Sequence, residues 1–170
     1  MKKFVNYFVV SILIVLTSCG GSGSKEITPK NNENPILANE QPTDKVWKDF
    51  TVRGIGNTMA EMKFDIGNIT VEEGSWVRIT LVNEGVDNAM QHNIVFINYG
   101  TRKEIASQAI AAGSSMKFVP NNEDVIAASD LAMPGETVVL EFEAPSKGNY
   151  EYLCTYPGHG EIMRGYFFVK

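Results

Sequence analysis

The chain has 170 residues, of which 44% are hydrophobic and 21% are charged, and its 20 acidic side chains outnumber 15 basic ones. A chain of this length can bury one substantial core, and its composition is that of an ordinary globular domain. The formal net charge of −5 comes without a stripe of basic residues. Nucleic acid is therefore excluded as a partner, because binding to phosphates depends on clustered positive charge.

Residues 1–18 are predicted to be an export signal. Met1, Lys2 and Lys3 form a short basic start, and an apolar run of roughly thirteen residues follows from 4 to 16. This length suits the apolar core of a signal peptide. A transmembrane anchor is the weaker interpretation, because spanning a bilayer takes ~20 apolar residues. Loss of the signal removes Lys2 and Lys3 and makes the mature chain more acidic still.

Cys19 follows the apolar run and is the predicted site of lipidation. The segment Leu16-Thr17-Ser18-Cys19 resembles the lipobox of bacterial lipoproteins, in which the cysteine is lipidated and becomes the mature N-terminus. Each buried acyl methylene adds ~0.8 kcal/mol of membrane affinity. We therefore expect a cell-envelope protein held on a membrane by its lipid, on the periplasmic side or at the cell surface. The alternative is ordinary secretion with Cys19 lost or free.

The rest of the chain divides into a tether, which with the lipidated cysteine spans 19–45, and a folded domain at 46–170. The tether is rich in Asn, Pro, Glu, Thr and Gln, so it cannot bury enough apolar surface to offset the entropy of ordering it. The domain alternates short apolar and polar runs with turn residues, which predicts an all-β sandwich. One short helix is expected at 102–112. The expected strands are 50–53, 62–65, 69–72, 77–82, 92–97, 125–128, 137–142, 150–153 and 165–169.

The last third of the domain carries the residues with the most distinctive chemistry. Cys154, His159 and Met163 form a C-x4-H-x3-M pattern directly after a predicted strand, and His92 opens another strand. Thiolate and thioether are soft ligands, and two His and one Cys with a weak axial Met is the ligand set of electron-transfer copper. Taken singly, each residue has a structural explanation, since Cys and Met are often core residues. The chain has two histidines in all, so their joint placement with the cysteine favours a metal site.

Cys154-Thr155-x-Pro157-Gly158-His159 with Met163, and Met90-x-His92-Asn93 upstream, resemble the azurin and auracyanin branch of the cupredoxins. The resemblance covers about 46–170 and implies a Greek-key β-sandwich that binds one type 1 copper ion. It implies that His92, Cys154 and His159 are equatorial ligands, that Met163 is the axial ligand, and that the Gln91 carbonyl makes a further weak axial contact. Azurins have glycine at the position of Gln91, and the azurin disulfide has no counterpart here.

The resemblance also implies how the site is supported and used. Asn93 would bridge the two ligand segments, and amides near Asn93 and Tyr156 would point at the Cys154 sulfur, because such outer contacts tune a metal centre. The protein would not be an enzyme but a shuttle that cycles copper between Cu(I) and Cu(II). Its partners would be c-type cytochromes or a terminal reductase or oxidase. His159 would lie nearest the surface, Glu161 would select a cationic partner, and the apolar docking rim would comprise Met90, Pro157, Gly158, Gly160 and Ile162.

Four alternatives stay open at the sequence level. An enzyme with a Cys154–histidine nucleophile would need an orienting acid and an oxyanion site, and multicopper enzymes need further histidine clusters. A copper storage or delivery protein would favour exposed, exchangeable ligands. Zinc suits the same residues. The domain could also serve as the donor to a separate copper or haem reductase.

Overall fold

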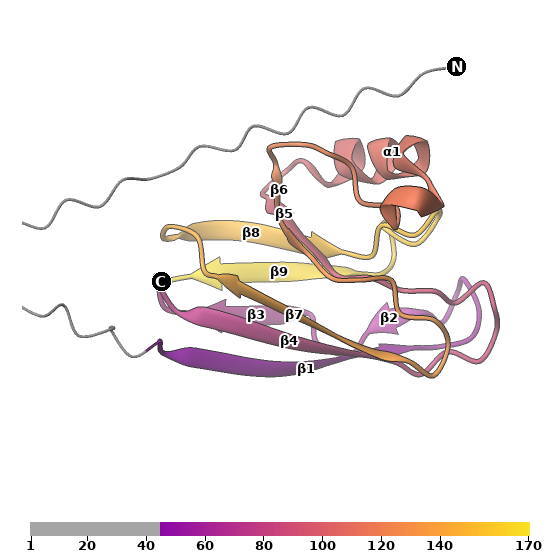
Figure 1. Ribbon diagram of the computed structural model, residues 1–170, viewed down its shortest axis with the longest axis horizontal. Helices are drawn as coiled ribbons and strands as arrows, with labels where there is room; N and C mark the ends of the chain where they lie inside the picture. Colours follow the sequence, from indigo (N-terminus) through magenta and orange to yellow (C-terminus); the bar gives the residue numbers. More distant parts are fainter. Residues whose placement is uncertain (1–44) are drawn as a thin grey trace, which may run out of the picture. The chain divides into compact units, whose positions relative to one another are not determined.

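The computed structural model describes residues 45–170. The predicted signal segment, the lipidation of Cys19 and nearly all of the tether lie outside these residues. Two sheets and one helix make up the described domain (Figure 1). The elements are β1 Trp47–Ile55, β2 Lys63–Phe64, β3 Asn68–Val71, β4 Trp76–Asn83, β5 Val95–Asn98, α1 Arg102–Ala112, the 3-10 turn η1 Ser114–Met116, β6 Val125–Ala128, β7 Thr137–Glu143, β8 Gly148–Leu153 and β9 Arg164–Val169.

The sheet topology is that of a Greek-key sandwich, as predicted. One sheet has the strand order β2-β1-β4-β7 and the other β3-β9-β8-β5-β6. The pairs β1 with β4 and β3 with β9 are parallel, and the remaining pairs are antiparallel. Strands distant in sequence therefore lie side by side in both sheets.

Period-two alternation builds the core between the sheets. In β4 the side chains of Val77, Ile79 and Leu81 are fully buried, while those between them are half-buried. They meet residues such as Phe96 and Phe167 from the other sheet in one hydrophobic cluster. Burying a side chain of this size contributes about 1.5–3 kcal/mol, so this alternation stabilises the sandwich.

The helix covers the outer face of the second sheet. Figure 1 shows α1 on the side of β5 and β8 that faces away from β1 and β4. Ile105 is fully buried and packs with Val95, Ile97 and Leu153 in a second cluster, as the helical spacing predicted. The helix ends at Ala112, and the next residue, Gly113, has a φ of 69°, which favours glycine. Within residues 45–170 no helix has the length and apolar character needed to cross a membrane.

Two strands, β1 and β5, begin three residues away from the predicted position, and the other boundaries agree within two residues. β1 extends over Trp47–Ile55 rather than 50–53, because it pairs in parallel with β4 along nearly its whole length. The strand predicted at 92–97 begins only at Val95. His92 instead forms an isolated bridge with Ala132, through backbone hydrogen bonds of 3.1 and 2.8 Å. His92 therefore precedes β5 and does not open it.

Candidate metal centre

The segment after β8 folds back on itself through backbone hydrogen bonds. The Cys154 amide donates to the Met163 carbonyl at 2.9 Å, and the Met163 amide donates to the His159 carbonyl at 2.9 Å. The His159 amide donates to the Tyr156 carbonyl at 3.0 Å. Gly158 has a φ of 85°, a conformation that glycine adopts without steric cost. These bonds return Cys154, His159 and Met163 to the same region of the fold.

His92 approaches that region from the other ligand segment. Its bridge to Ala132 fixes its backbone, and its ring packs on Gly54 of β1. A Cβ atom at Gly54 would lie 2.9 Å from His92 Cδ2 and 3.0 Å from Met163 Cε. Glycine at this position therefore makes room for both side chains.

Three potential ligand atoms converge in the interior. His92 Nδ1 and His159 Nδ1 are 3.3 Å apart, and Cys154 Sγ is 3.9 Å from the first and 3.7 Å from the second. All three residues are buried. Atoms held at about 2.0–2.3 Å from one ion with trigonal angles would be about 3.5–3.8 Å apart. The donor set and its spacing therefore fit a single soft metal ion.

Two further predicted residues lie at this centre. Met163 is fully buried, and its terminal methyl group shares the space over Gly54 with the His92 ring. The carbonyl oxygen of Gln91 is 4.0 Å from Cys154 Sγ. Both residues therefore lie where they could add weak contacts to an ion held by the three convergent atoms.

Asn93 connects the two ligand segments. Its Oδ1 accepts a hydrogen bond from the Thr155 amide at 2.8 Å, and its Nδ2 donates to Thr155 Oγ1 at 2.8 Å and to the Lys117 carbonyl at 3.1 Å. Burial raises the pKa of the Cys154 thiol, and the backbone amides of Asn93 and Tyr156 partly offset this effect. The bridge by Asn93 that the resemblance implies is present, and outer contacts of this kind orient ligand side chains.

Burial sets the protonation states of the three convergent residues. Desolvation lowers the pKa of His92 to about 4, with a smaller contribution from His159, and lowers the pKa of His159 to about 4. Desolvation raises the pKa of the Cys154 thiol to about 12, against the two amides. Neutral imidazoles are ready to donate a lone pair, whereas the thiol must lose its proton to become a ligand. His92 Nε2 is buried without a hydrogen-bond partner among the described residues.

The expected docking rim is only partly present at the surface. Gly158 and Ile162 are exposed and Pro157 is half-buried, but Met90 and Gly160 are buried. They are buried because Met90 packs on Gly85, and Gly160 packs between α1 and β8. That part of the prediction was wrong.

Two further expectations concern single residues near the rim. His159 is 1% exposed and His92, Cys154 and Met163 are 0% exposed, so His159 lies nearest the surface, as expected, but its ring barely reaches it. Glu161 pairs with Arg102 at 2.7 Å, and its side chain is 62% exposed. The selection of a cationic partner by Glu161 therefore stays a prediction.

Sequence reasoning missed several residues that shape the centre. Gly54 carries a recognisable signal, because a lone glycine within a strand pattern often marks a close approach of another group. Asn83 is buried and donates to the carbonyls of Met90 and Ala132 at 2.7 and 2.9 Å, which fixes the segment before His92. No sequence pattern pointed to this asparagine.

Comparison with known proteins agrees with this geometry. A family model described as copper binding proteins, plastocyanin/azurin family, matches residues 52–170. Auracyanin-A of Chloroflexus aurantiacus is 30% identical and covers 100% of both chains. Azurin of Pseudomonas chlororaphis is 27% identical over 65% of this chain and 91% of its own. Outer membrane protein H.8 of Neisseria meningitidis is 29% identical over 61% of this chain and 60% of its own.

Solved structures give the same result. Auracyanin A of Chloroflexus aurantiacus, described as a "blue" copper protein, superposes with a TM-score of 0.66 and 31% identity, covering 73% of this chain and 99% of its own. Azurin iso-2 of Methylomonas sp. strain J gives 0.65 and 28%, covering 72% and 97%. The fold, the convergent ligand atoms and these matches lead to one conclusion: the chain belongs to the plastocyanin/azurin family of copper-binding proteins, in its azurin and auracyanin branch.

Proposed function

We propose that this protein is an envelope-anchored carrier of single electrons with one type 1 copper ion held by His92, Cys154, His159 and Met163. The observation that carries the proposal is the spacing of three buried ligand atoms, 3.3 to 3.9 Å apart. Bound copper supplies a centre that changes between Cu(I) and Cu(II) by one electron. The protein's part is to keep the ligands in place while the charge changes.

Each ligand has a role that its surroundings support. His92, Cys154 and His159 would hold the ion most closely, because their ligand atoms face one another. Met163, and more weakly the Gln91 carbonyl, would add distant contacts, and such contacts tune the potential of these centres. Asn93 holds the two segments together, so few atoms need to move when an electron arrives.

An enzyme built on a Cys154 nucleophile is disfavoured by the same site. A catalytic thiol needs a lowered pKa and access to substrate, whereas Cys154 is fully buried and its pKa is raised. In the described part of the chain, the cluster of Cys154 with His92 and His159 includes no carboxylate that could orient a catalytic base.

Storage or delivery of copper is the second candidate, and the burial of the ligands weighs against it. Exchange of metal between proteins requires ligands that a partner can reach, whereas His92, Cys154 and His159 are at most 1% exposed. Electron donation to a separate copper or haem reductase is compatible with the electron-carrier proposal and requires the same site.

Addition of Cu(II) to the purified mature protein tests the proposal. We expect one copper ion per chain, an intense visible absorption from copper bound to thiolate, and loss of this absorption on reduction. Cys154→Ser is the control and should show no such band. Zinc should bind without colour. A colourless copper complex, or a band that survives in Cys154→Ser, would contradict the proposal.

We also propose that acylated Cys19 anchors the protein to a membrane of the cell envelope and that residues 20–45 act as the tether. Support comes from the order of basic start, apolar run and lipobox-like segment. Redox proteins such as a c-type cytochrome or a terminal reductase or oxidase would then be its partners. The mature protein should partition into detergent, and Cys19→Ser should release it into the aqueous phase. Aqueous partitioning of the unaltered protein would contradict the anchor.

A further inference from the structure

Arg102, the first residue of α1, reaches from the helix to the turn between His159 and Met163. Its Nη1 donates to the Glu161 carboxylate at 2.7 Å and to the Gly160 carbonyl at 3.4 Å. We propose that Arg102 is a positioning residue that holds the turn 159–163 and thereby sets the geometry of the metal centre. This inference rests on the proposed function, because it concerns the same site.

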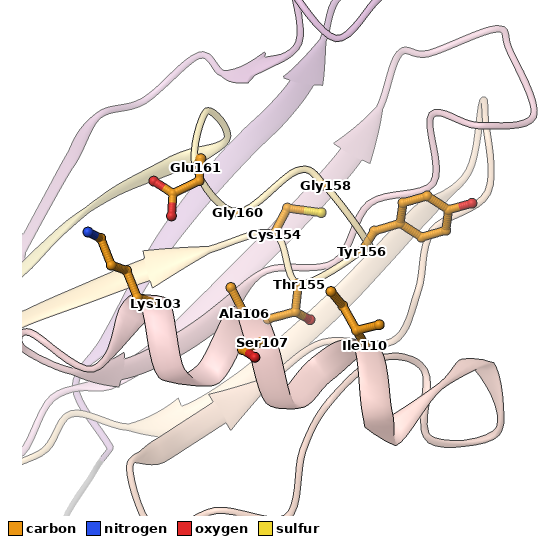
Figure 2. Close-up of a pocket in the computed structure, with 10 residues that line it drawn as sticks. All are labelled: Lys103, Ala106, Ser107, Ile110, Cys154, Thr155, Tyr156, Gly158, Gly160 and Glu161. Carbon is orange, nitrogen blue, oxygen red and sulfur yellow. The ribbon is translucent and has the colours of Figure 1, made fainter.

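Besides this polar contact, the turn meets the helix where Gly160 packs between Ala106 of α1 and Leu153 of β8. Figure 2 shows α1 facing the segment that follows Cys154, and a cavity of about 280 Å³ lies between them. Its lining includes Lys103, Ser107 and Ile110 from the helix and Gly158 and Glu161 from the opposite side. A cavity removes the partner atoms that dispersion attraction requires, so beyond Gly160 packing adds little to the connection. The polar contact from Arg102 is therefore the second link between the helix and the turn.

The helix that carries Arg102 is fixed to the sheet. Ile105 and Ala109 are fully buried and fix α1 to the sheet. The Arg102 side chain is 15% exposed, and its Nε lies 4.0 Å from the Glu151 carboxylate of β8 but has no hydrogen-bond partner among the described residues. Glu151 accepts a hydrogen bond from the Gly100 amide at 3.0 Å. Arg102 thus lies at ion-pair distance from a buried carboxylate on the sheet and donates a hydrogen bond to the exposed carboxylate on the turn.

The turn that Arg102 contacts begins and ends with two of the proposed ligands, His159 and Met163. The amides of Ile162 and Met163 both donate to the His159 carbonyl, at 3.0 and 2.9 Å. These bonds set the distance between the His159 and Met163 side chains. Without Arg102 the turn would open more often, and both side chains would shift relative to Cys154.

Amide hydrogen exchange of the metal-free protein tests the contact without any metal chemistry. In Arg102→Gln we expect the Ile162 and Met163 amides to exchange roughly tenfold faster, because a hydrogen bond to a charged group is lost. Lys103→Gln is the matched control: it removes one positive charge from the same helix beside Glu161 but breaks no hydrogen bond to the turn, and we expect a change below about twofold. Unchanged exchange in Arg102→Gln would overturn the proposal.

The copper-loaded variants test whether the contact positions ligands. Arg102→Gln should shift the reduction potential, alter the Cu(II) hyperfine splitting and release copper to a chelator roughly tenfold faster. Lys103→Gln should leave the hyperfine splitting unchanged, and Arg102→Lys should restore part of the change. Faster exchange with an unaltered hyperfine splitting would reduce Arg102 to a structural residue and overturn the proposal.

Glu161→Ala gives a second test of the contact between Arg102 and the turn. Should Arg102→Gln fail to fold, Glu161→Ala removes the partner carboxylate at the surface and should raise exchange of the same amides about threefold; no increase would overturn the proposal. A failure of the proposed function would show separately, because the unaltered protein would then give no copper–thiolate absorption, while the exchange rates would still report whether Arg102 holds the turn.

Discussion

Asn93 holds Thr155 from both sides: its side-chain oxygen accepts from the Thr155 amide and its nitrogen donates to the Thr155 hydroxyl, both at 2.8 Å. Asn93→Ala would leave the buried Thr155 amide and the Lys117 carbonyl without these partners. We expect a loss of about 3 kcal/mol in the free energy of unfolding of the metal-free protein, measured by denaturant titration. Asn149→Ala, at an exposed position of β8, is the control and should change it by less than ~0.5 kcal/mol. Equal effects of the two substitutions would contradict this role.

The fold leaves no room for a side chain at Gly54, beside the metal centre. In Gly54→Ala the new methyl group would meet the His92 ring at 2.9 Å and Met163 Cε at 3.0 Å. We expect a cost of about 1–3 kcal/mol from overpacking, together with a changed visible spectrum of the copper form. Gly67→Ala is a matched control, since a Cβ there meets nothing within 4 Å. A normal spectrum in Gly54→Ala would show that the His92 ring and Met163 do not need this space.

Metal uptake should release about one proton per ion at pH 7. The raised pKa of Cys154, about 12, keeps the thiol protonated before binding, while the lowered pKa values of His92 and His159, about 4, keep both imidazoles neutral. Calorimetric titration in buffers of different ionisation enthalpy gives this number. Cys154→Ser should release almost none. A count of two or three would mean that the histidines are protonated in the metal-free protein.

The metal-free protein should become less stable as the pH falls from about 6.5 to about 4. The unfolded chain protonates its histidines near the ordinary pKa of 6.5, but folding lowers the pKa of His92 and His159 to about 4. The unfolded state binds more protons in this window, so acid favours unfolding. We expect a loss on the order of 2 kcal/mol for each histidine, measured by thermal or denaturant unfolding between pH 7 and pH 4. His92→Gln should remove about half of this slope, and an unchanged slope would count against the burial of a neutral imidazole.

Local patterns were enough to predict part of this architecture. The bounds of α1 agree with the expected 102–112, because helix formers and helical spacing act over a few residues. The ligand candidates stood out because histidine is scarce in this chain and the chemistry of a Cys-His-Met pattern is distinctive. The structure does bring His92 beside Cys154 and His159.

Features that depend on distant parts of the chain were not predictable in the same way. β1 is longer than predicted because it pairs in parallel with β4. His92 lies outside β5 because its backbone forms a bridge with Ala132. The contact of Arg102 with Glu161 spans 59 positions. No local periodicity indicates such a pairing.

The position of β9 in its sheet has a consequence for biosynthesis. β9 lies between β3 and β8, so residues 68–71 find their neighbour only when residues 164–169 exist. A ribosome makes the chain from the N-terminal side, and Met163 emerges directly before that last strand. The four candidate ligand residues therefore coexist only after translation has passed Met163, and β3 gains its partner strand only when β9 has been made.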